Sequence, residues 1–186
     1  MAKVYAGSSC TKKRGLRFIE GDPYCSKEVL VNNGETKFDV IILMDNSFGY
    51  ETKSKDIAML RNLSAVTNKN CLLILETENR DWRLLNFEPF TFFETAKIQI
   101  FGKWNFHFET SVSEGSMKFY ERMSIKSDDM KMRLKLQMLM KLYSLHELIE
   151  LLQDSGWDYR NSYDDIISQI PFANNSMSLF SISKLR

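Results

Sequence analysis

The apolar positions of residues 39–75 follow two different periods. Asp39 to Met44 contains a continuous apolar run, Val-Ile-Ile-Leu-Met, which is typical of a strand buried on both faces of a parallel sheet. Lys55 to Val66 has apolar residues three and four positions apart, which predicts an amphipathic helix. Cys71 to Leu75 is a second continuous apolar run. The pattern therefore predicts a strand–helix–strand unit with a right-handed crossover.

Residues 91–141 change to a period of two, which is typical of antiparallel strands with one solvated face. Lys97–Phe101 and Trp104–Glu109 alternate in this way, and Gly102-Lys103 is expected to connect them as a tight turn. Met117–Ile125 and Lys131–Met138 continue the alternation. We therefore expect three or four antiparallel strands, inserted into the α/β pattern.

Further elements are predicted on both sides of these two regions. Leu16–Glu20 is a short strand candidate that ends at Gly21-Asp22-Pro23. Ser144-Leu145-His146-Glu147 is a capping box, which starts a helix that runs to Gln153 or Asp154 and stops at Gly156. The last two strand candidates are Trp157–Tyr163 and Met177–Ser183. The chain is thus expected to be a single α/β domain of residues 1–186, with 91–141 as an antiparallel insertion.

Composition excludes several classes of function. The chain has 25 Lys and Arg against 24 Asp and Glu, so its charge gives no reason to expect nucleic-acid or membrane binding. We read Lys12-Lys13-Arg14 as a solvated helix end. The three cysteines, Cys10, Cys25 and Cys71, have no metal-like spacing, which favours a reducing, cytoplasmic setting without a metal site. No apolar stretch reaches the ~18–20 residues that span a bilayer.

Polar residues follow each strand of the predicted parallel sheet. In such sheets, ligands bind outside the carboxyl ends of the strands. A single Asp or Asn at such a position commonly caps a turn instead, but several at one edge favour a shared crevice. The candidates are Gly21, Asp22, Asp45, Asn46, Ser47, Glu76 and Asn79.

Four stretches together resemble the class I S-adenosylmethionine-dependent methyltransferases. They are KKRGLRFIEGD, FDVIILMDNSFGY, CLLILETENRDWRLLNF and LYSLHELIELLQDSGW, and the resemblance covers residues from about 10 to 185. It implies a Rossmann-like sheet, S-adenosylmethionine as cofactor and a small-molecule or unidentified acceptor. Methyl transfer from a sulfonium depends mainly on positioning and on the exclusion of water, so no catalytic dyad is required.

The resemblance also implies roles for individual residues. Asp22, in the pair Gly21-Asp22, would accept a hydrogen bond from the adenine amino group, and Asp45, Asn46 and Ser47 would lie beside the methionine end of the cofactor. Phe48 and Tyr50 would wall the methyl-transfer pocket. The insertion would cover the acceptor with Trp104, His107, Arg133 and Tyr143. Trp104 could instead be a packing residue. Arg133 lies on the polar face of its strand, and His107, on the face opposite Phe106 and Phe108, could instead be a surface residue.

The sequence departs from the family at its first motif. No strand followed by a glycine-rich E/D-x-G-x-G turn precedes KKRGL, so we expect an N-terminally incomplete sheet in which the first strands of the family order 3-2-1-4-5-7-6 are absent. Such a sheet would expose an apolar edge. Three explanations stay open: the true start lies upstream, a second copy or another chain completes the sheet, or the first predicted strand pairs directly with the strand at 39–44. In each case we expect the chain as given to bind the cofactor poorly or not at all. The alternative function is a non-catalytic subunit that docks through this edge. A different nucleotide-binding enzyme is disfavoured, because no phosphate-binding glycine loop is present.

Overall fold

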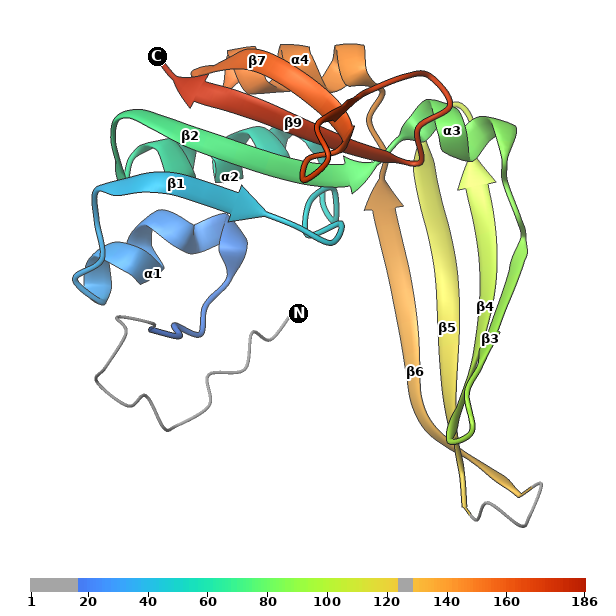
Figure 1. The fold of residues 1–186 in the computed structure, drawn as a ribbon. Helices are drawn as coiled ribbons and strands as arrows, with labels where there is room; N and C mark the ends of the chain where they lie inside the picture. Colours follow the sequence, from blue (N-terminus) through green and yellow to red (C-terminus); the bar gives the residue numbers. More distant parts are fainter. Residues whose placement is uncertain (1–16, 124–128) are drawn as a thin grey trace.

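The computed structural model describes residues 17–123 and 129–186, which form two sheets and several short helices (Figure 1). The helical segments are η1 (Pro23–Cys25), α1 (Ser26–Asn32), α2 (Lys53–Ser64), α3 (Arg80–Leu85) and α4 (Leu145–Asp154). The strands are β1 (Phe38–Leu43), β2 (Thr67–Glu78), β3 (Phe90–Glu94), β4 (Ile98–His107), β5 (Val112–Arg122), β6 (Met130–Lys141), β7 (Trp157–Asp165), β8 (Ile170–Pro171) and β9 (Ser178–Leu185).

The first sheet has the order β1-β2-β9-β7-β8. β1 and β2 are parallel and are joined through α2, which confirms the predicted strand–helix–strand unit. The pairs β2–β9, β9–β7 and β7–β8 are antiparallel. The run β1-β2-β9-β7 corresponds to the 4-5-7-6 part of the sheet order that the resemblance implies.

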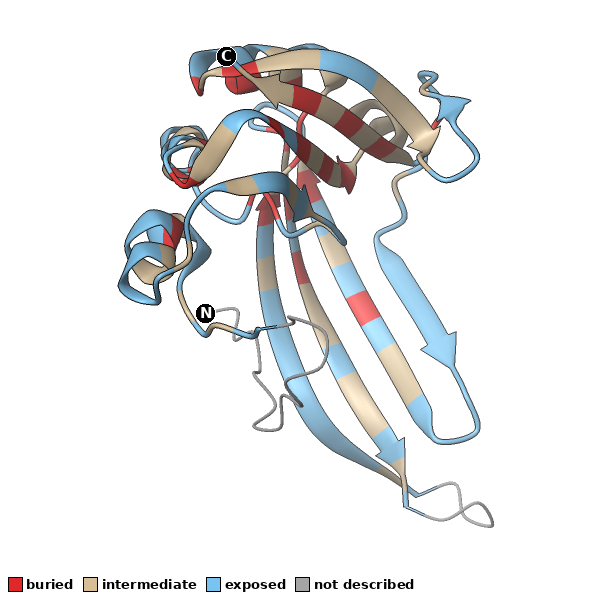
Figure 2. Cartoon of the chain, turned by 60° about the vertical axis from the view of Figure 1, so that its left-hand side comes forward, coloured by how far each residue is buried: buried red, intermediate tan, exposed pale blue. Residues whose placement is uncertain are grey.

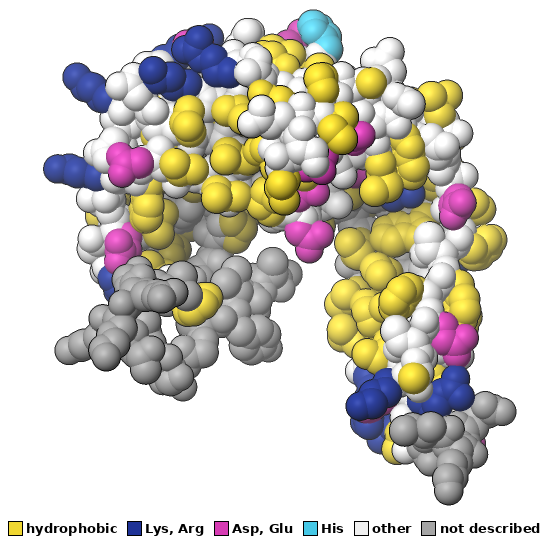
Figure 3. Space-filling model, in the orientation of Figure 1, with side chains coloured by type: hydrophobic (Ala, Val, Ile, Leu, Met, Phe, Trp, Pro, Cys, Tyr) yellow, Lys and Arg dark blue, Asp and Glu magenta, His cyan; other side chains and the backbone are white. Residues whose placement is uncertain are grey.

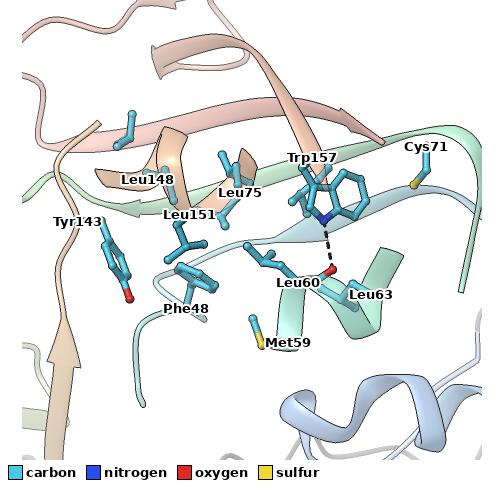
Figure 4. Packing of buried hydrophobic residues seen from close by; sticks show 13 residues of the cluster. Phe48, Met59, Leu60, Leu63, Cys71, Leu75, Tyr143, Leu148, Leu151 and Trp157 are labelled. Carbon is cyan, nitrogen blue, oxygen red and sulfur yellow. Dashed lines mark hydrogen bonds between the residues drawn. The ribbon is translucent and has the colours of Figure 1, made fainter. Parts of the chain in front are cut away.

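Helices α2 and α4 supply the core on one face of this sheet (Figure 4). α4 begins at the predicted capping box, in which Ser144 accepts from the Glu147 amide while the Glu147 carboxylate accepts from the Ser144 amide. Trp157 is fully buried between the sheet and α2, and its indole N–H donates to the Leu60 carbonyl at 3.2 Å. The buried side chains of this cluster are Phe48, Met59, Leu60, Leu63, Cys71, Leu73, Leu75, Tyr143, Leu148, Leu151, Leu152, Trp157 and Leu179.

The opposite face of the first sheet carries apolar side chains that no helix of the described chain covers. The register aligns them in rows, since Val40 lies opposite Leu72, and Ile42 lies opposite Ile74 and then Ile182. Val40 is 45% exposed and Ile42 is 60% exposed, so the prediction that this strand is buried on both faces is wrong. We call this surface the open face: it comprises Val40, Ile42, Leu72, Ile74, Phe180 and Ile182.

The segment before the first sheet also differs from the prediction. Arg17 to Glu20 form no strand, and the Arg17 guanidinium donates to the Asn33 carbonyl and to the Glu35 carboxylate, both at 2.7 Å. β1 consequently pairs with β2 alone and is an edge strand. Leu16, Lys12-Lys13-Arg14, Cys10 and Ile125 lie outside the described residues.

The second sheet, β3-β4-β5-β6, is antiparallel throughout and extends from one end of the molecule (Figure 1). We call residues 90–123 and 129–141 the arm, and the rest of the described chain the body. The predicted turn at Gly102-Lys103 is wrong, since β4 runs straight through it. A Cβ on Gly102 would lie 2.2 Å from Thr91 Oγ1 and 2.7 Å from the Trp104 indole nitrogen. Gly102 thus marks a close approach of side chains to the strand rather than a turn.

The two faces of the arm differ in chemistry. One face carries no charged side chain along most of its length, because Phe93, Ile100, Phe119 and Leu134 form one row across the four strands and Trp104, Gly115 and Met138 form another. Only the end near α3 has a buried cluster, made of Phe106, Met140 and Leu142. Elsewhere the strands are mostly exposed or intermediate (Figure 2). The arm apolar face comprises Phe93, Ile98, Ile100, Trp104, Phe106, Met117, Phe119, Leu134, Leu136, Met138 and Met140.

Candidate functional site

The segment that follows β1 leaves the sheet through an uncommon backbone conformation. Asp45 has φ 57° and Asn46 has φ 54°, so two consecutive non-glycine residues lie in the left-handed region. Each such residue costs roughly 1–2 kcal/mol and persists only where its surroundings hold it. Asp45 and Ser47 are exposed, and within the described chain their side chains make no hydrogen bond or ion pair. The turn therefore presents a carboxylate and a hydroxyl at the carboxyl end of β1.

Two side-chain contacts to β2 hold this turn. The Asp45 amide donates to the Glu76 carboxylate at 2.8 Å, and the Glu78 amide donates to the Asn46 side-chain oxygen at 2.6 Å. The structure thus brings together three of the predicted positions, Asp45, Asn46 and Glu76. It also shows that the Asn46 oxygen is already used by the protein.

The end of β2 is fixed by a buried ion pair. Arg83, on α3, contacts the Glu78 carboxylate through two nitrogens, at 2.8 and 2.9 Å, and both side chains are largely buried. Burial raises the pKa of Glu78, and the guanidinium of Arg83 opposes this shift. Asn79 is fully buried: its side-chain nitrogen donates to the Ser176 carbonyl, and its side-chain oxygen caps α3 by accepting from the Asp81 amide. Asn79 thus has a structural role in this conformation.

The aromatic residues that follow Ser47 separate into core and surface. Phe48 is fully buried and packs against the Tyr143 ring at a centroid distance of 5.8 Å, so neither side chain lies on a pocket wall. The Tyr143 hydroxyl donates to Asp56 at 2.6 Å, and the Tyr24 hydroxyl contacts the same carboxylate at 3.3 Å. Tyr50 is 39% exposed, and partial burial together with the Asp45 charge raises the pKa of its phenol. Tyr50 is the aromatic residue of this segment that a ligand can reach.

The remaining predicted residues do not join this turn. Asp22 begins η1, where its carboxylate accepts from the Tyr24 amide at 2.9 Å, and Gly21 packs against Val29. The Trp104 indole donates to Thr91 at 3.1 Å on the arm, and His107 contacts Glu114 at 3.2 Å on the opposite face of the arm. Arg133 pairs with Glu121 at 2.6 Å. An adenine contact at Asp22 and acceptor contacts on the arm stay predictions.

Two hollows lie outside the predicted positions. One, of about 270 Å³, is on the arm beside exposed phenylalanines, and is lined by Phe90, Thr91, Phe92, Phe101, Gly102, Lys103, Ser116 and Lys118. The other, of about 550 Å³, adjoins the start of α4, and is lined by Arg80, Asp81, Ser144, Leu145, His146, Ile149, Phe172 and Asn174. The second hollow combines residues of two stretches that carry the family resemblance, around Arg80 and around Ser144, but none of its residues was predicted as a site residue.

Other kinds of site find no support in the described residues. Across residues 17–123 and 129–186, no group of three or more His, Cys, Asp or Glu is placed to hold a metal ion. Cys25 and Cys71 are free thiols. Among the helices of the same residues, none is long and apolar enough to cross a membrane.

The hydrogen bond from Glu78 to Asn46 can be tested by two substitutions. Asn46→Gly removes the acceptor but tolerates the positive φ, so we expect a loss of about 1 kcal/mol of unfolding free energy. Asn46→Ala also removes the acceptor and in addition strains the backbone, which we expect to cost a further ~1–2 kcal/mol. Urea denaturation of both variants measures this. Equal stability of the two variants would contradict the backbone assignment.

Comparisons with known proteins match at the level of structure. No family model and no curated protein matches the sequence. A methyltransferase from Clostridium acetobutylicum ATCC 824 superposes with a TM-score of 0.69 at 12% identity, covering 81% of this chain and 59% of its own. CcbJ from Streptomyces caelestis gives 0.67 at 11% identity, with 82% and 63% covered. The sugar N-methyltransferase KedS8 from Streptoalloteichus sp ATCC 53650 gives 0.57 at 11% identity, with 81% and 57% covered.

This chain therefore spans about three fifths of the length of the solved structures that it resembles. The first two of these proteins are described as methyltransferases, the Clostridium protein as S-adenosylmethionine-dependent, and the third as a sugar N-methyltransferase. At 11–12% identity, the similarity to these structures shows the fold alone. The chain has the Rossmann-like α/β fold of the S-adenosylmethionine-dependent methyltransferases, with an antiparallel second sheet.

Proposed function

We propose that this chain is part or all of an S-adenosylmethionine-dependent methyltransferase that acts on a small molecule. The observation that carries the proposal is the turn at Asp45-Asn46-Ser47. It presents a carboxylate and a hydroxyl without protein partners among the described residues, at the sheet edge where α/β folds bind ligands. Two hydrogen bonds, from the Asp45 amide to the Glu76 carboxylate and from the Glu78 amide to the Asn46 side chain, hold the turn in this conformation.

The residues present fit one end of the cofactor. The Asp45 carboxylate offers a negative charge to the cationic methionine end, and the Ser47 hydroxyl offers a further hydrogen bond. Asn46 fits less well, since its oxygen already accepts from the Glu78 amide. The cofactor would supply an activated methyl group. The part of this chain is to orient the ligands and to exclude water, which are the main requirements of such a transfer.

Fewer residues of this chain fit the adenine end of the cofactor. Asp22 caps η1, and the sequence holds no glycine-rich turn after a strand. A ligand held at one end keeps only part of its contacts but still loses its translational and rotational freedom. We therefore expect the chain alone to bind the cofactor with a Kd of about 1 mM or weaker.

The proposal also includes the methyl acceptor, a small molecule, and the cellular location, a reducing cytoplasm. A small-molecule acceptor is supported by KedS8, a sugar N-methyltransferase with a similar fold. The free thiols of Cys25 and Cys71 agree with a reducing, cytoplasmic setting. The second candidate, a non-catalytic subunit, is favoured by a different observation, the uncovered apolar face and free edge of β1.

Ligand-observed NMR with S-adenosylhomocysteine tests the proposed function. We expect weak saturation transfer from wild-type protein, and its loss in Asp45→Asn, because that substitution removes the carboxylate that would pair with the ammonium group of the homocysteine moiety. Asp154→Asn, at the far end of α4, is the matched control and should leave the signal unchanged.

Three other outcomes of this NMR experiment would contradict part of the proposal. Micromolar affinity would contradict the expected weakness, and would indicate a complete cofactor site. No transfer at millimolar ligand would contradict the cofactor assignment and favour the non-catalytic subunit. A signal that survives Asp45→Asn would move the site away from this turn.

A further inference from the structure

The arm has a second face, opposite the arm apolar face, where phenylalanine and lysine side chains lie together. Figure 3 shows that the arm exposes both hydrophobic and basic side chains. Because side chains alternate along a strand, the register gives this second face two neighbouring rows, which we call the mixed patch. One row is Phe92, Phe101, Lys118 and Lys135, and the next is Phe90, Lys103, Ser116 and Gln137.

The hollow of about 270 Å³ on the arm lies within the mixed patch. Its walls include Phe90, Phe92 and Phe101, which are 68%, 56% and 45% exposed. The Phe92 and Phe101 rings are 4.8 Å apart between centroids, so they form one continuous aromatic surface. Lys103 and Lys118 line the same hollow. A ligand in the hollow would therefore meet aromatic rings and positive charge together.

The lysines of the mixed patch have no counter-charge within the described chain. Lys103, Lys118 and Lys135 are exposed, and none makes a hydrogen bond or an ion pair with another described residue. Lys118 and Lys135 lie directly opposite each other on β5 and β6, an arrangement of like charges that destabilises a sheet. An anion bound beside these ammonium groups would relieve that repulsion.

Carboxylates limit the mixed patch along the strands. The row on one side of it contains Glu94, and the row on the other side contains Glu114. Both already pair with other side chains, Glu94 with Arg122 and Glu114 with His107. A single-stranded nucleic acid needs a basic groove that continues along its backbone, and here its phosphates would meet these carboxylates. The mixed patch therefore fits a small anion better than a polyanion.

We propose that the hollow binds a small aromatic carboxylate, with the ring on the phenylalanines and the carboxylate at Lys103 and Lys118. Its volume lies below the roughly 300–1,000 Å³ of pockets for drug-sized ligands, which suits a molecule of about one or two rings. An uncharged aromatic molecule would leave the ammonium groups without a counter-ion, and an inorganic anion would leave the rings in water. The site uses no residue of the turn at Asp45 and is additional to the proposed methyl transfer.

NMR titration of the isotopically labelled full chain tests this with three probes. Naphthoate carries both an aromatic ring system and a carboxylate, naphthamide keeps the rings without the charge, and cyclohexanecarboxylate keeps the charge without an aromatic ring. We expect a Kd of about 1 mM for naphthoate, and at least about fivefold weaker binding of the other two probes. Added salt should raise the Kd of naphthoate but not that of naphthamide.

Substitutions in the hollow separate the contributions of charge and ring. In the double variant Lys103→Gln/Lys118→Gln, naphthoate should bind no more tightly than naphthamide, because both charges are removed. Phe101→Leu should weaken both aromatic probes about threefold and keep the preference for naphthoate. Lys131→Gln and Phe108→Leu, exposed on the arm but outside the hollow, are the matched controls and should bind as wild type does. Circular dichroism checks that each variant is folded.

Several results would overturn the proposal. They are the absence of saturable binding up to about 10 mM naphthoate, equal affinity of wild type for naphthoate and either other probe, and a naphthoate Kd that the double substitution leaves unchanged. Tighter binding of an oligothymidine, weakened by the same double substitution, would replace the proposed site with a nucleic-acid site. None of these experiments involves Asp45 or S-adenosylhomocysteine, so this inference and the proposed function fail separately.

Discussion

Gly49→Ala is expected to destabilise the protein by about 3 kcal/mol or more. Gly49 has φ 91°, which a residue with a Cβ adopts only with strain. A Cβ at this position would also lie 2.3 Å from the Lys141 carbonyl oxygen, an atom of the backbone that cannot move aside alone. Since the Lys141 amide donates to the Gly49 carbonyl at 2.7 Å, the substitution would also disturb the joint between body and arm.

Gly34→Ala is the matched control for this prediction. Gly34 has a similar φ, 75°, but an added Cβ there meets no atom within 4 Å. Its substitution should therefore cost only the backbone strain, about 1 kcal/mol. Chemical denaturation of both variants separates the two contributions. If the two glycines cost the same, the close contact with Lys141 does not exist in solution.

Replacing Asp56 by asparagine is expected to flatten the dependence of stability on pH. Asp56 is fully buried, and this burial raises its pKa to about 6, although hydrogen bonds from Tyr143, Tyr24 and the Gly49 amide lower it in part. In the unfolded chain the carboxyl group has its ordinary pKa of about 4. Between these two values the folded state binds more protons than the unfolded state.

The sign of the effect follows from that difference. Because the folded state holds the proton more tightly, the free energy of unfolding falls as pH rises from about 4 to about 6, and stays low above that. A shift of roughly two pH units corresponds to about 3 kcal/mol. An asparagine side chain does not ionise in this range, so the Asp56→Asn variant should lose this slope.

Urea denaturation of wild type and Asp56→Asn between about pH 4 and pH 7 measures the slope. Burial also raises the pKa of Glu78, which contributes in the same direction in both proteins and cancels in the comparison. Parallel stability curves for the two proteins would show that Asp56 titrates in the folded state as it does in the unfolded chain.

The sequence correctly predicted those helices and strands that depend on residues close together in the chain. The capping box at Ser144 and Glu147 needs only residues three positions apart, and the helix at 55–66 needs only its apolar period. The apolar runs at 39–44 and 71–75 indicated two adjacent parallel strands, and β1 and β2 are such a pair. In each case the physical cause lies within one element or one crossover.

The errors have long-range causes. A continuous apolar run predicts a strand but does not reveal whether a helix covers each face, so the exposure of Val40 and Ile42 was missed. A glycine followed by a lysine is typical of a turn, so the sequence predicted one at Gly102. In the structure the side chains of Thr91 and Trp104 lie against Gly102 and leave no room for a Cβ. Tyr143 contacts Asp56 across 87 residues of sequence, so its place in the core could not be deduced from its own segment.

In the candidate site, too, some features depend on neighbouring residues and others on contacts between distant parts of the sequence. Asp45, Asn46 and Ser47 were predicted to lie at the carboxyl end of a strand, and they directly follow β1 and Met44. The left-handed backbone of this turn and its contacts with Glu76 and Glu78 depend on how β1 and β2 are aligned. Sequence therefore located the turn, and register decided which of its side chains are free.

The buried cluster of Phe106, Met140 and Leu142 attaches the arm to the body at one end only. The arm therefore resembles a beam that is fixed at one end, beside α3, while the rest of the described β4, β5 and β6 extends away from the body. Bending displacement of such a beam grows with distance from its support, while its strand ladders resist stretching along the long axis. A rotation of the arm about this support would leave the hydrogen bonds between its strands intact.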